Sequence, residues 1–98
     1  MKIRIIASAI RDLEKARDFD DEQGEGLGSY LVDSLFSDID SLALYGGIHP
    51  KHWGYHRLLS KRFPFAVYYR VSADLVDVWR VLDCRQRPSK IRRALEEP

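Results

Sequence analysis

Hydrophobic residues recur with two different periods along the chain, and each period predicts a different kind of element. Residues 2–7 alternate between apolar and charged side chains at their start, which predicts a short first strand. Residues 9–23 and 31–43 carry apolar side chains every three or four positions, as amphipathic helices do, and Ser8 is a suitable N-cap for the first helix. Glycines at 24, 26 and 28 predict a turn, so the two helices should form an antiparallel hairpin. The apolar positions are Ile10, Leu13, Ala16 and Phe19, then Leu31, Leu35, Ile39 and Leu42.

The second half of the chain changes to a period of two after an irregular stretch at 49–54. Residues 55–60, 63–72 and 75–83 predict three strands, and the short connections between them make the strands antiparallel neighbours in a meander. In the middle strand the odd positions face one way and the even positions face the other. Pro88 fits the first turn of a last short helix over 89–97, which we expect to fray at the end of the chain.

These elements predict an α+β fold in a single domain spanning residues 1–98. The order is an N-terminal strand, an antiparallel helical hairpin, a three-stranded antiparallel meander and a short C-terminal helix. The first strand is expected to join the sheet, because a lone strand leaves its backbone groups unpaired. One layer of sheet against the helical hairpin is the simplest packing of these elements.

Composition narrows the class of protein. Hydrophobic residues make up 45% of the chain, which is enough for a compact core and excludes a disordered chain. The single cysteine, Cys84, cannot form an internal disulfide, and no segment has the apolar length of a signal peptide or a membrane span. We therefore expect a soluble, cytoplasmic protein. No metal and no other cofactor is expected, since Cys84 is the only thiolate and no Cys-X-X-Cys pair exists.

The net charge of +1 is the sum of two oppositely charged halves. Residues 1–44 hold five basic and ten acidic residues, net −5, whereas residues 45–98 hold eleven basic and five acidic residues, net +6. Such an asymmetry is typical of a protein with an anionic partner, so the candidate functional residues are sought in the second half. The acidic residues of the first helix, beginning with Asp12, are interpreted as a solvated helix face.

Four stretches of sequence carry a family resemblance. They are ASAIRDLEKARDF (7–19), GLGSYL (26–31), YHRLLSKRFPFAVYY (55–69) and VWRVLDCR (78–85). Together they resemble the helical hairpin and the meander of the RelE/ParE toxins of bacterial type II toxin–antitoxin systems. The resemblance covers nearly the whole chain and implies a growth-inhibiting toxin, of the kind involved in plasmid stabilisation. It also implies a cognate antitoxin that folds a flexible C-terminal segment against the toxin.

The target that the resemblance implies depends on the branch of the family. One branch cleaves messenger RNA in the ribosome, which requires a group that takes the 2′-OH proton, cations beside the phosphorane and an acid for the leaving oxygen. Arg57 and Arg85 match two basic residues of that set. Leu59 and Ala66 stand where further basic residues are expected, and the tail after Pro88 lacks the expected tyrosine. The other branch poisons DNA gyrase without cleaving RNA, and the missing residues favour it or an unassigned target.

The candidate site residues come from this resemblance and from charge. Arg57, Arg85 and His56 are the catalytic candidates, the last because it lies beside Arg57 and histidine titrates near neutral pH. The candidates for binding the target or the antitoxin are Arg57, Lys61, Arg62, Arg85 and Arg87. Exposed Lys and Arg often serve solubility alone, and aromatic residues of strands more often form core than base-stacking surfaces.

Three functions stay open at this stage. The preferred one is a toxin with DNA gyrase or an unassigned target. The second is a messenger RNA endonuclease that acts with or without the ribosome. The third is an inactive toxin or a non-toxic nucleic-acid-binding module. The expected partners are the antitoxin and either gyrase or the ribosome with its messenger RNA, and no membrane.

Overall fold

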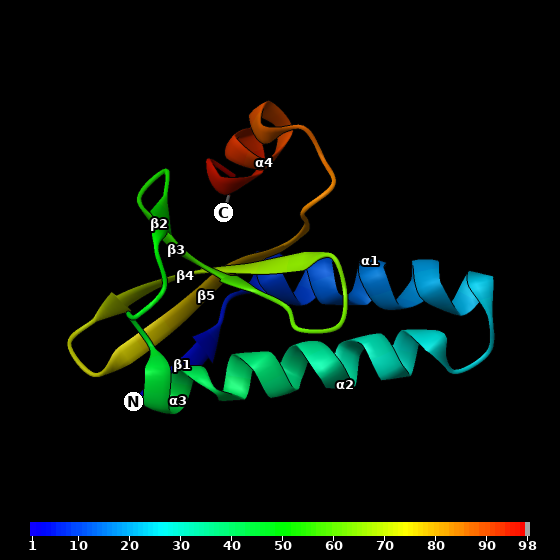
Figure 1. Ribbon diagram of the computed structural model, residues 1–98, viewed down its shortest axis with the longest axis horizontal. Helices are drawn as coiled ribbons and strands as arrows, with labels where there is room; N and C mark the ends of the chain where they lie inside the picture. The colour runs from blue at the N-terminus through cyan, green and yellow to red at the C-terminus, as the bar shows by residue number, and fades with distance from the viewer. Residues whose placement is uncertain (98) are drawn as a thin grey trace.

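The computed structural model describes residues 1–97, and Figure 1 shows how their helices and strands follow one another. In chain order the elements are β1 (Lys2–Ile5), α1 (Ala7–Gln23), α2 (Leu27–Asp40), α3 (Leu42–Tyr45), β2 (Lys51–His52), β3 (Tyr55–Leu59), β4 (Phe65–Ser72), β5 (Leu75–Asp83) and α4 (Pro88–Leu95). The predicted order is confirmed, with α3 and β2 as additions. Within residues 1–97, none of the helices has the length and apolar character of a membrane span.

All the strands form one sheet in the order β1-β5-β4-β3-β2. β1 pairs in parallel with β5, and the other neighbours are antiparallel. The expectation that the first strand joins the sheet is confirmed, as is the meander of β3, β4 and β5. The stretch expected to be irregular contains β2 instead, because Lys51 and His52 pair with His56 and Tyr55 across a two-residue turn.

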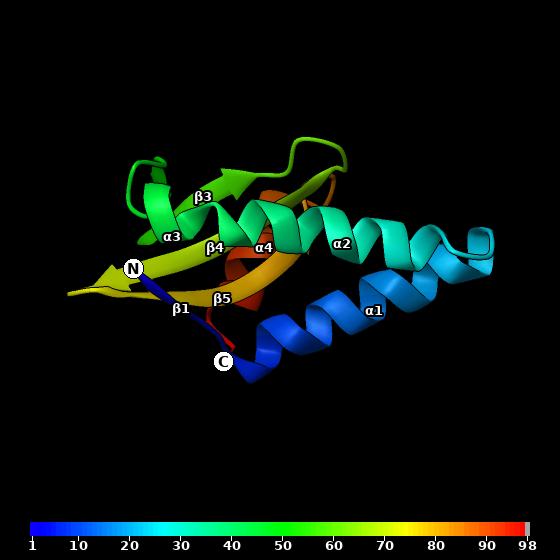
Figure 2. The ribbon, with the colours of Figure 1, turned by 90° about the horizontal axis from the view of Figure 1, so that it is seen from below.

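The helical hairpin of α1 and α2 covers one face of the sheet, and α4 covers part of the other face (Figures 1 and 2). The larger core lies under the hairpin, where the alternate positions of β4 and β5 meet the apolar faces of both helices. The hairpin extends beyond the sheet, so its far end has no sheet beneath it (Figure 1). The larger core consists of Ala9, Leu13, Ala16, Leu31, Leu35, Ile39, Leu42, Val67, Tyr69, Val76, Val78 and Val81.

Gly28 allows the two helices of the hairpin to approach closely. A Cβ atom at this position would lie 2.2 Å from the carbonyl oxygen of Arg17, which no side chain tolerates. The backbone N–H of Gly28 donates to Asp21 Oδ1 at 2.9 Å, so the end of α1 also satisfies a donor in the first turn of α2. Gly28, which was predicted to lie in a turn, therefore allows the close contact between α1 and α2.

The packing differs from the simplest one expected, because α4 covers the face of the sheet that the helical hairpin leaves free. Ile91 and Leu95 of α4 are buried in a second, smaller core on the other face. The predicted alternation of the middle strand supplies both cores, because Tyr69 faces the hairpin and Tyr68 faces α4. The second core consists of Tyr55, Ala66, Tyr68, Leu82, Ile91 and Leu95.

Side chains of the sheet satisfy carbonyl groups at the end of α4, which have no partner within the helix. The indole N–H of Trp79 donates to the carbonyl oxygen of Leu95 at 2.9 Å, and Arg80 donates to that of Ala94 at 2.7 Å. A β-bulge makes this possible, since the register with β4 passes from Val78 directly to Arg80. Two consecutive residues, Trp79 and Arg80, therefore both reach α4.

The start of α1 also differs from the expectation. The helix begins at Ala7 with Ile6 at the N-cap position, so Ser8 is not the cap and lies inside the first turn. Ser8 is buried, and its hydroxyl donates to the carbonyl oxygen of Trp79 at 3.0 Å. Because Ile6 N–H also donates to the carbonyl of Val78, contacts with β5 place the start of this helix.

The turn between β2 and β3 holds a bulky residue in an unfavourable backbone conformation. Its two central residues, Trp53 and Gly54, have φ values of 54° and 85°, the combination found in type I′ turns. Glycine and asparagine favour the first of these positions, whereas a bulky L-residue there costs about 1 kcal/mol. The indole of Trp53 nevertheless lies partly exposed at the surface.

Trp53→Gly should have a free energy of unfolding about 1 kcal/mol higher than Trp53→Ala, because glycine adopts a positive φ without a Cβ contact. Both variants lose the indole, so the difference between them isolates the backbone strain. Denaturant unfolding of the two proteins measures it. Equal stabilities would show that the turn is not strained.

Candidate functional site

The loop after β3 and the segment after β5 meet at one end of the sheet. Leu59 pairs with Ala66, Phe65 pairs with Asp83, and the N–H of Cys84 donates to the carbonyl of Pro64 at 2.8 Å. The candidate cations of the two segments therefore emerge at the same end. We call this set the sheet-end cations: Lys61, Arg62, Arg85 and Arg87.

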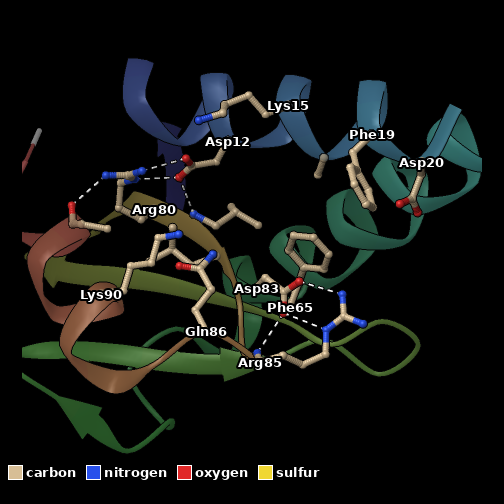
Figure 3. A pocket seen from close by; sticks show the side chains of 14 residues that line it. Asp12, Lys15, Phe19, Asp20, Phe65, Arg80, Asp83, Arg85, Gln86 and Lys90 are labelled. Carbon is tan, nitrogen blue, oxygen red and sulfur yellow. Dashed lines mark hydrogen bonds and ion pairs between the residues drawn. The ribbon is translucent and has the colours of Figure 1, made fainter. Parts of the chain in front are cut away.

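Arg85 is exposed and bound to a neighbouring carboxylate (Figure 3). Its Nε and Nη2 atoms donate to the two oxygens of Asp83 at 3.0 and 2.7 Å, and its backbone N–H donates at 2.8 Å. These hydrogen bonds lower the pKa of Asp83. The pair leaves the outer edge of the guanidinium accessible, but Asp83 offsets much of its charge.

Lys61 and Arg62 lie over α2, on the hairpin side of the sheet. Arg62 Nη1 donates to the hydroxyl of Tyr30 at 2.6 Å, and its guanidinium lies 5.9 Å from the centre of that ring. Both cations border a groove of about 510 Å³ that also includes Asp33 and Asp38 of α2. This groove therefore carries charges of both signs.

Arg57 is on the face of the sheet that α4 covers. It is opposite Tyr68 in the sheet register, and its Nη1 donates to His52 Nε2 at 3.4 Å. Its Nε atom is buried and has no hydrogen-bond partner within residues 1–97. Burial raises the pKa of Tyr68 and of Cys84, and the charge of Arg57 offsets only part of that rise. Both groups therefore stay protonated near neutral pH.

His56 is on the opposite face from Arg57, because successive residues of a strand point to opposite sides. Its ring stacks on Tyr69 with 5.0 Å between ring centres, and its Nδ1–H donates to the carbonyl oxygen of His49 at 2.7 Å. The structure thus does not bring the proposed catalytic pair together. The histidine beside Arg57 is His52, which adjacency in sequence did not single out.

Leu59 and Ala66 adjoin Arg57 on the face that α4 covers, as the resemblance implied for an RNA-cleaving set. Leu59 is 53% exposed, whereas Ala66 is fully buried in the second core. One position is therefore apolar at the surface, and the other has no access to a substrate while α4 is in place. Neither supplies a cation for a phosphorane.

A groove of about 460 Å³ between α1 and α4, along the end of β5, was not predicted (Figure 3). Phe19 and Phe65 contribute aromatic rings to its lining, which also includes the cations Lys15 of α1 and Lys90 of α4. Phe19 was assigned to the buried face of the first helix by its spacing. It is instead 61% exposed and lines this groove together with Phe65 and Asp83, at the end of the sheet.

Asp12 and Arg80 form a buried ion pair at the other end of this groove, where they retain 8% and 15% of their side-chain exposure. Arg80 Nε and Nη2 donate to the two oxygens of Asp12 at 2.7 and 2.9 Å, and the N–H of Val81 donates to the same carboxylate at 3.0 Å. The interpretation of Asp12 as part of a solvated helix face is therefore wrong.

Within residues 1–97, no three His, Cys, Asp or Glu side chains come together as metal ligands.

Comparison with known proteins identifies the fold. The chain is similar to a chain of the solved structure "Chromosomal ParDE TA system from P. aeruginosa", with a TM-score of 0.73 and 22% sequence identity over 83% of this chain and 92% of that chain. This protein therefore shares the fold of that chain, and the α+β class predicted from the sequence is confirmed. No family model matches the sequence, and the search of curated proteins found no match.

Asp12→Ala should lower the free energy of unfolding by about 3 kcal/mol, because it leaves the guanidinium of Arg80 buried without a counter-charge. Replacing both partners, as Asp12→Leu with Arg80→Met, should recover much of that loss. Arg4→Ala removes an exposed pair with Asp77 and serves as the control with little effect. Thermal and denaturant unfolding measure all three, and a loss no greater in Asp12→Ala than in the control would show that the pair is not structural.

Stability should fall between pH 7.5 and pH 5 because of His49. Burial, together with the charge of nearby His56, lowers the pKa of His49, whose Nδ1 meets the hydroxyl of Tyr69. The unfolded chain therefore takes up the proton first, near pH 6.5, and stability is lost as the pH falls below that value. His49→Asn keeps a polar atom but cannot titrate, so its unfolding midpoint should depend less on pH, and an unchanged dependence would exclude His49 as the cause.

Proposed function

We propose that this protein is the toxin of a type II toxin–antitoxin system and that it acts on a target other than messenger RNA, with DNA gyrase as the first candidate. The observation that supports this proposal most directly is the ParE-like fold, shared with a chain of a ParDE system. The sequence resemblance to RelE/ParE toxins supports it independently, because it depends on residues of the meander as well as on the order of elements.

The arrangement around Arg57 favours a target other than RNA. Cleavage at a 2′-OH needs a proton acceptor and several cations around the phosphorane. Leu59 and Ala66 supply none, the tyrosine and cysteine nearby have raised pKa values, and His56 faces away.

An RNA endonuclease remains the second candidate because of one contact. His52 Nε2 accepts a hydrogen bond from Arg57 Nη1 at 3.4 Å, so an unprotonated imidazole nitrogen lies beside a guanidinium. That contact brings an imidazole nitrogen and a guanidinium together on the face of the sheet that α4 covers.

We also propose that a cognate antitoxin binds across the sheet end, with acidic residues opposite Lys61, Arg62, Arg85 and Arg87 and an apolar side chain against Phe19 and Phe65. The exposure of Phe19 beside the cations Lys15 and Lys90 supports this placement. An acidic segment that orders on binding would gain both charge pairs and apolar burial there.

Induced expression of the chain alone should arrest growth, and co-expression of the neighbouring open reading frame should restore it. In the arrested cells, mapped RNA ends should be unchanged while plasmid supercoiling falls or broken DNA accumulates. RNA cuts that disappear in both Arg57→Ala and His52→Ala would support the endonuclease and contradict the preferred target. Harmless expression of folded protein would contradict the toxin itself.

The antitoxin arm of the same experiment uses a charge-reversed variant. Lys61→Glu combined with Arg62→Glu and Arg85→Glu should slow association with the antitoxin by roughly tenfold at low salt, because the sheet end then repels an acidic segment. Lys2→Glu, at the other edge of the sheet, is the matched control. Equal association rates for both variants would place the antitoxin elsewhere.

A further inference from the structure

The tip of the β2–β3 hairpin presents a half-exposed aromatic side chain, that of Trp53. Trp53 is 45% exposed, and its ring makes a tilted approach to that of His52, with 6.2 Å between ring centres. Keeping it at this position requires the positive φ described above. Strained backbone conformations cluster at ligand-binding sites, so a half-exposed aromatic residue held in one is a candidate for binding.

A cleft lies between this hairpin tip and the end of α4. It has a volume of about 310 Å³ and is lined by Trp53, Tyr55, Arg70, Arg92, Leu95 and Glu96. Figure 1 shows the hairpin and α4 rising on the same side of the sheet. The volume is at the lower end of the range for small-ligand sites, so the cleft suits one compact ligand unit.

The floor of the cleft holds a cation without a counter-charge. The guanidinium of Arg70 lies 4.2 Å from the ring centre of Tyr55 and 5.5 Å from that of Trp79. No carboxylate within residues 1–97 forms an ion pair with it, since Asp77, its neighbour in the sheet register, pairs with Arg4. A guanidinium stacked on a ring keeps its N–H edge available, and that edge matches phosphate geometry.

The second arginine of the cleft is only weakly paired. Arg92 Nε is 4.0 Å from Glu96, and both side chains are well exposed. A third arginine, Arg57 of β3, is on the same face of the sheet, because its neighbour in the register, Tyr68, faces α4. The surroundings of the indole therefore favour a ligand that is both planar and anionic.

We propose that this cleft binds one nucleotide of a single-stranded nucleic acid, with the base stacked on Trp53 and the phosphate held by Arg70 and Arg92. Aromatic side chains that stack on bases, beside arginines that contact the backbone, are the usual means of binding single strands without sequence preference. Arg57, on the same face of the sheet, contacts a neighbouring phosphate, which favours a strand over a free nucleotide. This site does not depend on the identity of the toxin's target.

The test uses the purified full chain and fluorescence anisotropy with labelled ten-nucleotide oligouridylate and oligodeoxythymidylate, with uridine monophosphate as competitor. Trp53→Gly should weaken binding of the oligonucleotides by about tenfold or more, whereas Trp53→Phe keeps an aromatic ring and should lose much less. Phe36→Ala, which removes an exposed aromatic ring from α2 on the other side of the sheet, should bind as the wild type does. Arg70→Gln should reduce the slope of log K against log salt by about 0.7.

Trp53→Gly also removes the strain at the turn, so it should unfold no more easily than the wild type and its loss of binding is not a loss of fold. Preference between the two oligonucleotides distinguishes RNA from DNA. Unchanged binding in Trp53→Gly, an equal loss in Phe36→Ala, or no binding of either oligonucleotide by the folded wild type would overturn the proposal. Binding of uridine monophosphate without binding of either oligonucleotide would contradict a single strand as the ligand and would indicate a free nucleotide instead.

Discussion

The buried ion pair between Asp12 and Arg80 is the interaction on which the packing of three elements depends. Asp12 comes from α1, Arg80 from β5, and the remaining donors of Arg80 reach the last carbonyls of α4. Two charges removed from water are tolerated only when each has a partner and the other polar atoms are satisfied. The N–H of Val81 and the carbonyl of Ala94 complete that requirement. The pair therefore specifies where α4 lies as well as how α1 meets the sheet.

The position of α4 decides what the second face of the sheet can do. With Ile91 and Leu95 packed on it, the small side chain of Ala66 fits beneath the helix, and a long basic side chain there would displace it. The face that the resemblance associates with RNA cleavage is thereby partly closed. What stays accessible is the sheet end, with its cations and Phe19, and the cleft beside Trp53. Both surfaces carry basic residues of the second half of the chain. The charge asymmetry of the sequence is therefore a difference between the helical hairpin, which is acidic, and the later strands and α4, which are basic. The ion pair of Asp12 and Arg80 connects the two.

Periodicity within an element predicted the fold because it depends on local geometry. The alternation of β4 assigned Tyr68 and Tyr69 to opposite faces, and the spacing of Leu31, Leu35 and Ile39 identified the buried face of α2. The spacing of hydrophobic residues within one element does not show which distant elements it contacts. Asp12 and Arg80 are 68 positions apart and each looks like a surface charge in its own segment. Phe19 has the spacing of a core residue, yet it is exposed at the end of the sheet, where it lines a groove with Phe65 and Asp83.

The same distinction applies to the site. Adjacency in sequence paired His56 with Arg57, whereas the pleat of β3 separates them and the β2–β3 turn brings His52 to Arg57 instead. Amide hydrogen exchange of α4 tests most directly whether the ion pair sets this arrangement. We expect the amides of residues 91–95 to be protected in the wild type and to exchange much faster in Asp12→Asn, while those of β4 stay protected. Equal protection of α4 in both proteins, or rapid exchange of α4 in the wild type, would contradict the account.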